Sequence, residues 1–329
     1  MAIFSCEHEV TNNLCSSDQT IDKASDDRWA VILAGGDGTR LQSLTRSISG
    51  DDRPKQFCPI IGGRTLLDQT SRRVALSVAP ERTLTVLTRT HKRFYRSLLR
   101  NVPKTRLLVQ PENKGTAPAL LFSLLHIAQL SPNATVAFFP SDHYFADDEQ
   151  FMSHIESAFS AAQTHPETVT LLGIKPESPE VEYGWIEPDV SLFGRQPRGI
   201  SRVRKFWEKP SALVARGLME RGCLWNSFVM VGRVDAFLKM TGRALPALFA
   251  FFSAIAPTFG TPGEARAMSE LYSWIPSTNF SHEVLALRPD NLAVMQVSEV
   301  GWSDLGEPKR VFSTLQQIGL QTQWAMPAS

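Results

Sequence analysis

The sequence is poor in the features that define several common protein classes. Its 329 residues include four cysteines, Cys6, Cys15, Cys58 and Cys223, and no Cys-x-x-Cys pair, so a zinc or redox site of that type is not indicated. The net charge of +1 gives no electrostatic case for nucleic acid or an anionic membrane as partner. The longest nearly apolar stretch, 244–257, is shorter than the ~20 residues of a membrane span and is interrupted by proline.

Neither a secretory leader nor a nucleophilic triad is expected from the sequence. Residues 1–27 are polar and acidic without apolar periodicity, which predicts a flexible extension. We see no secretory signal, so a cytoplasmic protein with reduced thiols is expected. No Ser/His/Asp or Cys/His arrangement is visible. The composition, 43% hydrophobic and 20% charged, is that of an ordinary globular chain, and a homo-oligomer is compatible with it.

The most informative segment that is present is a glycine-rich turn. Residues 29–40 have the sequence Trp-Ala-Val-Ile-Leu-Ala-Gly-Gly-Asp-Gly-Thr-Arg, and Lys55 follows in Arg-Pro-Lys-Gln-Phe. Glycines let backbone N–H groups approach an anion closely, and Arg40 and Lys55 add charge for polyphosphate oxygens. The turn matches neither the P-loop nor the dinucleotide fingerprint. The pattern predicts a nucleoside triphosphate site.

Short apolar runs alternate with helical patterns through the first half of the chain. The expected strands are 29–34, 84–88, 107–110, 136–140 and 169–174, and the expected helices are 65–77, 90–100, 116–130 and 148–164. Thr116 and Asp148 are expected to cap the last two helices. This alternation predicts an α/β fold with a doubly wound, mostly parallel sheet, whose ligands bind at the carboxyl ends of the strands.

The pattern changes after about residue 180. Strands without long intervening helices are expected at 183–187, 202–208 and 225–231, followed by helices over 233–272, a strand at 292–297 and a helix at 311–318. We therefore expect a partly antiparallel extension of the sheet. The predicted organisation is a catalytic domain over 28–310 with a helical insertion at about 233–290, and a C-terminal helix and tail over 311–329.

Two aspartates lie where a divalent cation could be held. Asp142 follows an apolar strand in Pro-Ser-Asp-His, and Asp304 lies in Gly-Trp-Ser-Asp-Leu-Gly. Each alone is equally an ordinary turn residue. Mg²⁺ takes one or two carboxylates together with phosphate oxygens, so the pair is sufficient. His143 is expected to be structural rather than a base.

Two further segments carry groups suited to a sugar phosphate. Glu208 ends a strand in Glu-Lys-Pro and can accept sugar hydroxyls, while Lys209 can meet a phosphate. Asn226, in Trp-Asn-Ser, has an amide that both donates and accepts. The alternatives are an exposed strand end for Glu208 and an ordinary strand entry for Asn226.

Taken together, the motifs resemble those of the sugar-1-phosphate nucleotidyltransferases, and among them the mannose-1-phosphate guanylyltransferases. Seven matches occur in the family's order: LAGGDGTRL (33–41), PKQF (54–57), TAPA (116–119), PSDH (140–143), EKP (208–210), WNS (225–227) and GWSDLG (301–306). The resemblance implies a Rossmann-like sheet of the GT-A-like type. It also implies in-line attack of a sugar-1-phosphate on the α-phosphorus of GTP, forming GDP-mannose and pyrophosphate with Mg²⁺.

The resemblance also implies roles for individual positions. Gly35, Gly36, Gly38 and Thr39 would hold the triphosphate, the Leu33–Ala34–Gly35 backbone the guanine edge, and Thr116 and Ala117 the base pocket. Arg40 and Lys55 would neutralise phosphate charge, and Asp142 and Asp304 would bind Mg²⁺. Gly184, Glu208, Lys209 and Asn226 would bind the sugar phosphate. Because the chain ends soon after Asp304, a form without a C-terminal isomerase domain is expected.

The chain departs from the family pattern in several places. Residues 41–45 are Leu-Gln-Ser-Leu-Thr, where the family has Leu-Trp-Pro-Leu-Ser. Residues 113–115 are Asn-Lys-Gly, where the family has Arg-Asn, and Phe228 stands where the family has Gly. The acidic residues of another family motif are out of register at 279–286. Two alternatives therefore stay open. One is the same chemistry with another NTP or hexose-1-phosphate, and the other is a non-catalytic nucleotide-sugar sensor.

Overall fold

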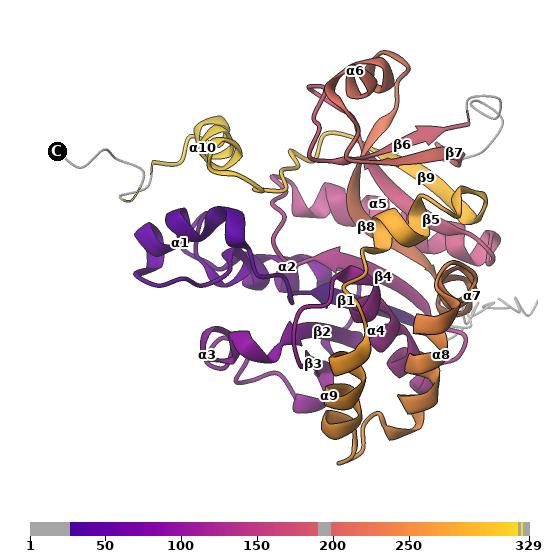
Figure 1. Ribbon diagram of the computed structural model, residues 1–329. Helices are drawn as coiled ribbons and strands as arrows, with labels where there is room; N and C mark the ends of the chain where they lie inside the picture. Colours follow the sequence, from indigo (N-terminus) through magenta and orange to yellow (C-terminus); the bar gives the residue numbers. More distant parts are fainter. Residues whose placement is uncertain (1–26, 190–198, 322–323, 325–329) are drawn as a thin grey trace, which may run out of the picture.

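The apolar run that begins at Arg28 forms an inner strand of a sheet. In the computed structural model, which describes residues 27–189, 199–321 and 324, β1 (Arg28–Leu33) pairs in parallel with β2 (Thr83–Thr88) and with β4 (Thr135–Pro140) (Figure 1). β3 (Leu107–Gln110) extends this parallel part beyond β2. The carboxyl ends of these strands meet at one edge, where the predicted glycine-rich turn follows β1.

The remaining strands add a mixed part to the same sheet. They are β5 (Val169–Ile174), β6 (Gly184–Pro188), β7 (Ile200–Glu208), β8 (Leu224–Arg233) and β9 (Leu292–Val297), in the overall order β3-β2-β1-β4-β8-β5-β9-β7-β6. β8 runs antiparallel between β4 and β5, β9 is parallel to β5, and β7 is antiparallel to both β9 and β6. The predicted α/β fold with a mixed sheet and antiparallel extension is confirmed.

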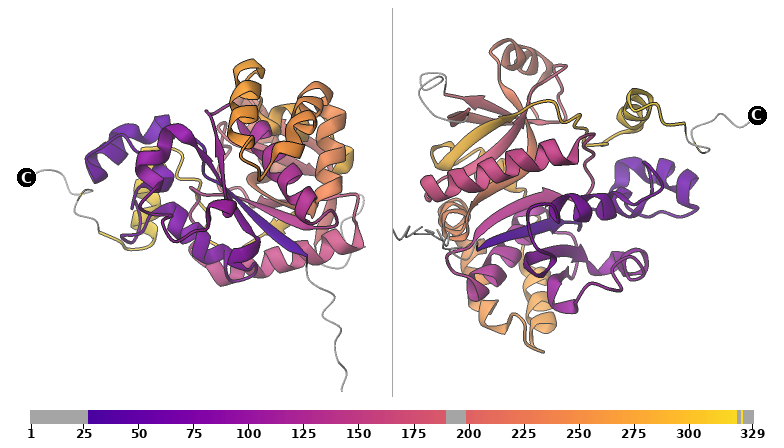
Figure 2. Two further views of the ribbon diagram at one scale, coloured as in Figure 1. Left: turned by 90° about the horizontal axis from the view of Figure 1, so that it is seen from below. Right: turned by 180° about the vertical axis from the view of Figure 1, so that it is seen from behind.

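Helices cover both faces of the sheet (Figure 2). One face is covered by α4 (Thr116–Leu130), α7 (Val234–Ala244), α8 (Pro246–Ile255) and α9 (Glu264–Trp274), and the other by α2 (Leu66–Val74), α5 (Asp148–Thr164) and α6 (Ala212–Glu220). α4 is apolar on nearly all sides because it lies between the sheet and the other helices of its face. Each fully buried aliphatic or aromatic side chain there contributes about 1.5–3 kcal/mol.

A third, smaller core lies beside the glycine-rich turn. It joins α1 (Gln42–Ser49) and the segment around Ile60 to α10 (Pro308–Gln317), through Leu41, Leu305 and Val311. The chain therefore returns from its far end to pack against the segment that follows the first strand. This packing brings the region of Asp304 close to Lys55.

Three local expectations are corrected. The helix expected over 90–100 is only α3 (Lys92–Tyr95), and the cations Lys92, Arg96 and Arg100 at i,i+4 spacing disfavour its continuation. Gly115, not Thr116, precedes α4 as its cap. Asp147, not Asp148, caps α5, because its side chain accepts the Gln150 N–H, whereas Asp148 pairs with Arg73.

The extension predicted for 1–27 lies outside the described residues except for Asp27. Of the helices that the structure describes, none combines the length and hydrophobicity needed to cross a bilayer.

Candidate functional site

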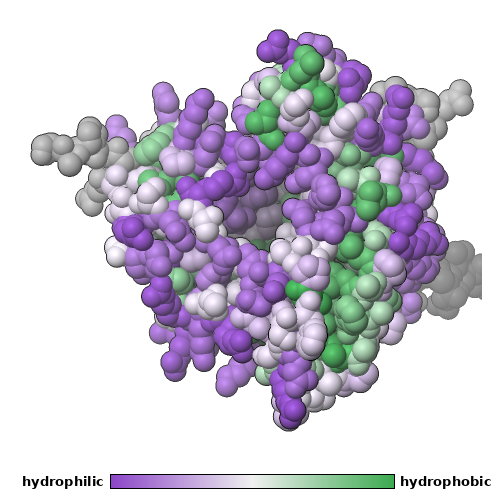
Figure 3. Space-filling view, in the orientation of Figure 1, coloured by the Kyte–Doolittle hydropathy of each residue, from purple (hydrophilic) through white to green (hydrophobic). Residues whose placement is uncertain are grey.

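A cavity of about 330 Å³ opens at the carboxyl ends of the parallel strands. Leu33 and Pro140 line it from the ends of β1 and β4, Gln110 from the end of β3, and Thr116 from the start of α4. Figure 3 shows a hollow near the centre of this face with hydrophilic side chains around it. The predicted ligand edge of the sheet therefore carries a concave site.

The glycine-rich turn forms part of the cavity wall, and each of its glycines has a different structural environment. A Cβ on Gly35 would lie 2.9 Å from both Gln110 Nε2 and Thr88 Oγ1, so a larger residue there would force these two buried side chains to shift. Gly38 adopts the left-handed φ of 61° and packs against Lys55 N. Gly36 lines the cavity and has open space around its Cβ position. Thr39 is exposed and begins a 3-10 turn, Thr39–Leu41.

Gln56 holds this turn in place, a role that the sequence reasoning missed. The buried side chain donates from Nε2 to the carbonyl oxygens of Ala34 at 3.2 Å and Gly36 at 2.7 Å. These two bonds orient the turn so that its carbonyls point toward Gln56. The Pro-Lys-Gln-Phe motif is the signal that could have indicated this.

The backbone predicted to contact the base is already engaged. Leu33 O accepts from Ser141 N at 3.1 Å, Ala34 N donates to Val86 O at 2.8 Å, and Gly35 O accepts from Thr88 Oγ1 at 2.9 Å. Leu33 and Gly35 line the cavity, but the side chain of Ala34 is fully buried behind it. Ala117 is likewise buried, with its N–H donated to Thr278 O. Neither alanine is among the cavity-lining residues.

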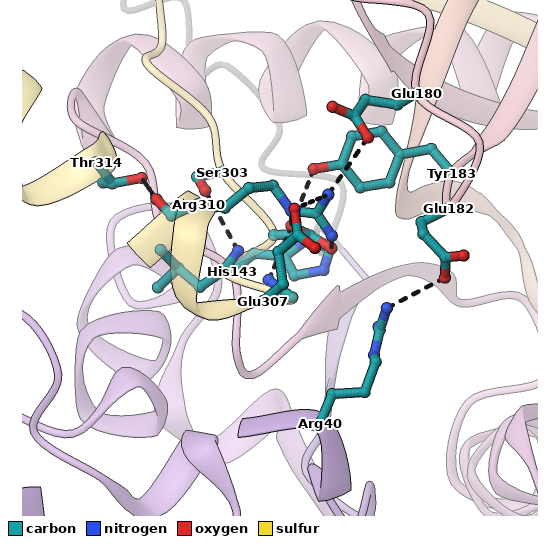
Figure 4. Close-up of polar contacts among 12 residues, drawn as sticks. Arg40, His143, Glu180, Glu182, Tyr183, Ser303, Glu307, Arg310 and Thr314 are labelled. Atoms are coloured by element: carbon teal, nitrogen blue, oxygen red, sulfur yellow. Dashed lines mark hydrogen bonds and ion pairs between the residues drawn. The ribbon is translucent and has the colours of Figure 1, made fainter. Parts of the chain in front are cut away.

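The two predicted phosphate cations differ sharply in environment. Lys55 is buried, and its Nζ donates to the backbone oxygens of Asp304 at 2.5 Å and Leu305 at 3.3 Å and lies 3.3 Å from Asp142 Oδ2. Arg40 is exposed and pairs with Glu182 at 3.3 Å (Figure 4). Lys55 is thus pre-positioned, whereas Arg40 is held only by a surface pair of the kind that contributes little stability.

Asp142 faces the cavity with much of its carboxylate available. Asp142 contacts Lys55 and also lies near His143, whose Nε2 is 3.8 Å from Asp142 Oδ1. Burial lowers the pKa of His143 to about 4, so this imidazole is neutral at physiological pH. Its Nδ1 accepts from Trp302 Nε1 at 3.3 Å, which agrees with the structural role expected for it.

Asp304 has a different environment. Its Oδ1 accepts from Tyr183 Oη at 2.9 Å and from Gly306 N at 2.9 Å, and lies 2.8 Å from Arg310 Nε. Burial opposes its ionisation, but the charges of Lys55 and Arg310 hold the pKa of Asp304 below its usual value. Burial also raises the pKa of Tyr183, which keeps its hydroxyl a donor.

The groups that already contact each aspartate carboxylate decide how well it could bind Mg²⁺. Asp142 supplies a cavity-facing carboxylate whose only close cation among the described residues is Lys55, and it fits. The Asp304 carboxylate is already paired with Arg310, and its Oδ1 already accepts two hydrogen bonds, so it does not fit as a ligand in this arrangement. Over the ranges that the structure describes, no group of three or more His, Cys, Asp and Glu side chains is arranged for a metal.

The predicted sugar-side residues lie together. Gly184 pairs with Glu208 across β6 and β7, and a Cβ on Gly184 would lie 3.1 Å from Glu208 Oε2 and 3.4 Å from Asn226 Cβ. Burial raises the pKa of Glu208, although nearby Lys209 and His282 oppose the shift. Lys209 extends into solvent, with its Nζ 3.6 Å from Glu182.

Phe228 explains one departure from the family motif in structural terms. It adopts the left-handed φ of 58°, a region that glycine occupies without cost, and it lines the cavity. Asn226 Oδ1 accepts the Phe228 N–H at 3.1 Å and so stabilises this turn. The side chain predicted to bind sugar therefore already has a structural bond.

Two segments distant in sequence complete the wall near α4. Thr116 Oγ1 accepts from Phe280 N at 2.8 Å, and a Cβ on Gly115 would collide with Thr278 O. Asp37 in the glycine-rich turn contacts His91 Nε2 at 3.0 Å and accepts from Asn113 Nδ2 at 2.8 Å. These contacts fix the turn relative to the loop after β3, and no sequence pattern predicted them.

The fold and this site define the class of the protein. The family model described as nucleotidyl transferase matches residues 29–319. The chain belongs to the nucleotidyl transferase family.

Individual relatives within this family are similar to the chain over most of its length. The chain is 29% identical over 293 residues to the xanthan biosynthesis protein XanB of Xanthomonas campestris pv. campestris, covering 88% of this chain and 60% of that protein. It is 27% identical over 303 residues to mannose-1-phosphate guanylyltransferase of Escherichia coli K12, covering 89% and 60%. The chain thus spans about 60% of the length of these curated relatives.

A solved structure agrees with these matches. It is described as mannose-1-phosphate geranyltransferase from Thermus thermophilus and aligns with a TM-score of 0.74 at 29% identity, covering 87% of this chain and 79% of that one. A UDP-glucose pyrophosphorylase in complex with UDP-glucose aligns at a TM-score of 0.54 and 16% identity, covering 89% of this chain and 98% of that one, and shows the fold alone.

Proposed function

We propose that this chain transfers a nucleotidyl group from GTP to mannose-1-phosphate, giving GDP-mannose and pyrophosphate. The observation that carries the proposal is that the glycine-rich turn and Asp142 line one cavity at the strand ends and that Lys55 lies 3.3 Å from Asp142. The relatives described as mannose-1-phosphate guanylyltransferases support the choice of substrates. The same chemistry with another NTP or hexose-1-phosphate is the alternative that the departures at 113–115 and Phe228 favour.

The chemistry is an in-line displacement at the α-phosphorus. An oxygen of the sugar phosphate forms the new bond to the α-phosphorus as the bond to pyrophosphate breaks. Negative charge therefore gathers on the sugar phosphate, the α-phosphate and the leaving pyrophosphate. Lys55 and Arg40 neutralise that charge, and the N–H groups of the glycine-rich turn orient the phosphates. The attacking phosphate is already anionic, so no general base is required. This accords with the neutral, hydrogen-bonded His143 beside the cavity.

Lys55 is the residue on which most of this charge stabilisation rests. Its ammonium is fixed before substrates arrive by two backbone oxygens and one carboxylate, so little reorganisation accompanies binding. Asp142 would hold Mg²⁺, which supplies further charge neutralisation for the phosphates when bound.

The sugar is proposed to bind between β6, β7 and β8. Gly184 packs closely beside Glu208, where a side chain would crowd the carboxylate, and the Glu208 carboxylate can accept from two hydroxyls. Lys209 lies where it can leave Glu182 for a phosphate. The cost of leaving is small, because the pair is exposed.

The decisive experiment measures pyrophosphate release with Mg²⁺ for four NTPs, each combined with mannose-1-phosphate, glucose-1-phosphate and other sugar phosphates. A single strong signal for GTP with mannose-1-phosphate is expected. A strong signal in another combination would keep the mechanism and change the substrate. No release in any combination, together with nucleotide binding, would point to a sensor instead.

A further inference from the structure

Arg310 lies against the carboxylate of Asp304, the second of the two predicted metal ligands. Its Nη2 donates to Asp304 Oδ2 at 3.4 Å, and its Nε lies 2.8 Å from Oδ1 as an ion pair without hydrogen-bond alignment. Both side chains are 14% exposed. Figure 4 shows Arg310 reaching from α10 toward Tyr183 and Glu180. A guanidinium that faces a carboxylate in this way neutralises it and also fixes its orientation.

The arginine is itself held from several directions. Its guanidinium carbon lies 4.9 Å from the centroid of the Tyr183 ring, and its Nη1 is 3.3 Å from Glu307 and 3.4 Å from Glu180. Displacing it would leave the mostly buried Asp304 carboxylate without its paired cation, which is costly in a low-dielectric environment. Arg310 is therefore held in place beside Asp304 by these contacts.

The backbone around Asp304 is shaped to admit this pair. A Cβ on Gly306 would collide with Asp304 Oδ2 and would lie 2.8 Å from Arg310 Nη2, so a glycine is needed for the two side chains to approach the chain. The preceding Leu305 adopts the left-handed φ of 47° although it is buried. The backbone oxygens of Asp304 and Leu305 both accept from Lys55 Nζ. The pair thus fixes the segment that positions Lys55.

We propose that Arg310 serves as the permanent cation of Asp304, so that Asp304 positions Lys55 and Asp142 alone provides the protein carboxylate for a divalent cation. This inference rests on the proposed function, since it concerns the metal used in that reaction. Arg310 is a positioning residue. It acts on Lys55 through the backbone at 304–305 and keeps the carboxylate of Asp304 from a metal.

The test titrates Mn²⁺ alone into the full chain and follows free Mn²⁺ by electron paramagnetic resonance. We expect Asp142→Asn to weaken binding about tenfold or more and Asp304→Asn to change it by less than about twofold. Arg310→Gln should tighten binding about tenfold, because it removes a cation and frees a second carboxylate. Arg233→Gln removes the same charge from a pair with Asp235 and serves as the matched control with no expected change.

The outcomes separate the inference from the proposed function. If Asp304→Asn weakened Mn²⁺ binding as much as Asp142→Asn, or if Arg310→Gln left the affinity unchanged, the inference would be overturned. Because Asp304→Asn removes several contacts and could impair folding, its circular dichroism and melting are measured alongside, and Arg310→Gln gives an independent decision. GTP binding is measured separately by calorimetry. A chain that binds Mn²⁺ as expected but no nucleotide would refute the proposed function and leave the inference standing.

Discussion

The parallel and antiparallel parts of the sheet build their sides of the cavity in different ways. The parallel part uses backbone and glycines: Gly38 and Gly115 take the left-handed positions, and Gln56 fixes the turn through carbonyl oxygens. The antiparallel part places Lys209 and Phe228 in left-handed conformations, just after β7 and within β8. The glycine-rich turn and the start of α4 thus carry little strain, whereas the sugar side keeps strained side chains that can differentiate substrates.

Lys55, predicted to contact the triphosphate, and Lys209, predicted to contact the sugar phosphate, give the largest expected contrast between these parts. Lys55→Met should lower turnover on the order of 10³-fold, because it removes a fixed charge beside the reacting phosphates. Lys209→Met should mainly raise the KM for the sugar phosphate, by about tenfold, because its side chain is exposed and flexible. Steady-state kinetics of pyrophosphate release measure both. Equal losses of kcat in the two variants would contradict the contrast.

The glycine-rich turn offers a comparison within the parallel part. Gly35→Ala should destabilise the protein by about 1–3 kcal/mol, because its Cβ would overlap Gln110 and Thr88. Gly36→Ala should leave stability nearly unchanged but weaken GTP binding, because the added methyl group lies at the cavity wall. Denaturant unfolding and calorimetric GTP titration separate the two effects. A larger loss of stability for Gly36→Ala would show that Gly35 is not the tightly packed position of this turn.

The strain at Phe228 predicts a smaller effect in the antiparallel part. Phe228→Gly and Phe228→Ala lose the same ring contacts, but only glycine accepts a φ of 58° freely. The glycine variant should therefore be more stable than the alanine variant by about 1 kcal/mol. Paired urea unfolding curves measure this difference. Identical midpoints would show that the turn relaxes and stores no strain.

Two carboxylates should give opposite, small pH dependences of stability. The raised pKa of Glu208 means that the folded state binds its proton more tightly, so the wild type should lose stability relative to Glu208→Gln as pH rises above about 4.5. The lowered pKa of Asp304 means that its contribution is present at neutral pH and should be lost, relative to Asp304→Asn, as pH falls below about 3.8. Unfolding free energies from about pH 3 to pH 7 check both signs. Parallel pH profiles for the two variants would contradict the assigned shifts.

The local elements and motifs could be predicted from the sequence. Strands at 107–110 and 292–297 are found at the predicted residues, because short apolar runs bounded by turn residues indicate a strand wherever it packs. The glycine-rich turn and Asp142 line one cavity, and Glu208 and Asn226 both lie beside Gly184. Carboxyl ends of neighbouring parallel strands necessarily share an edge of the sheet.

Other features depended on contacts between distant segments. The sequence by itself determined the α/β class, the order of the motifs and the residue types at the phosphate edge, because hydrophobic periodicity and the conformational freedom of glycine act over a few residues. Only the tertiary structure decided that Arg310 neutralises Asp304, that Gln56 holds the glycine-rich turn and that Phe280 donates to Thr116. Ion pairing and hydrogen bonding in a buried site depend on which groups lose water together, and that is set by how distant segments pack.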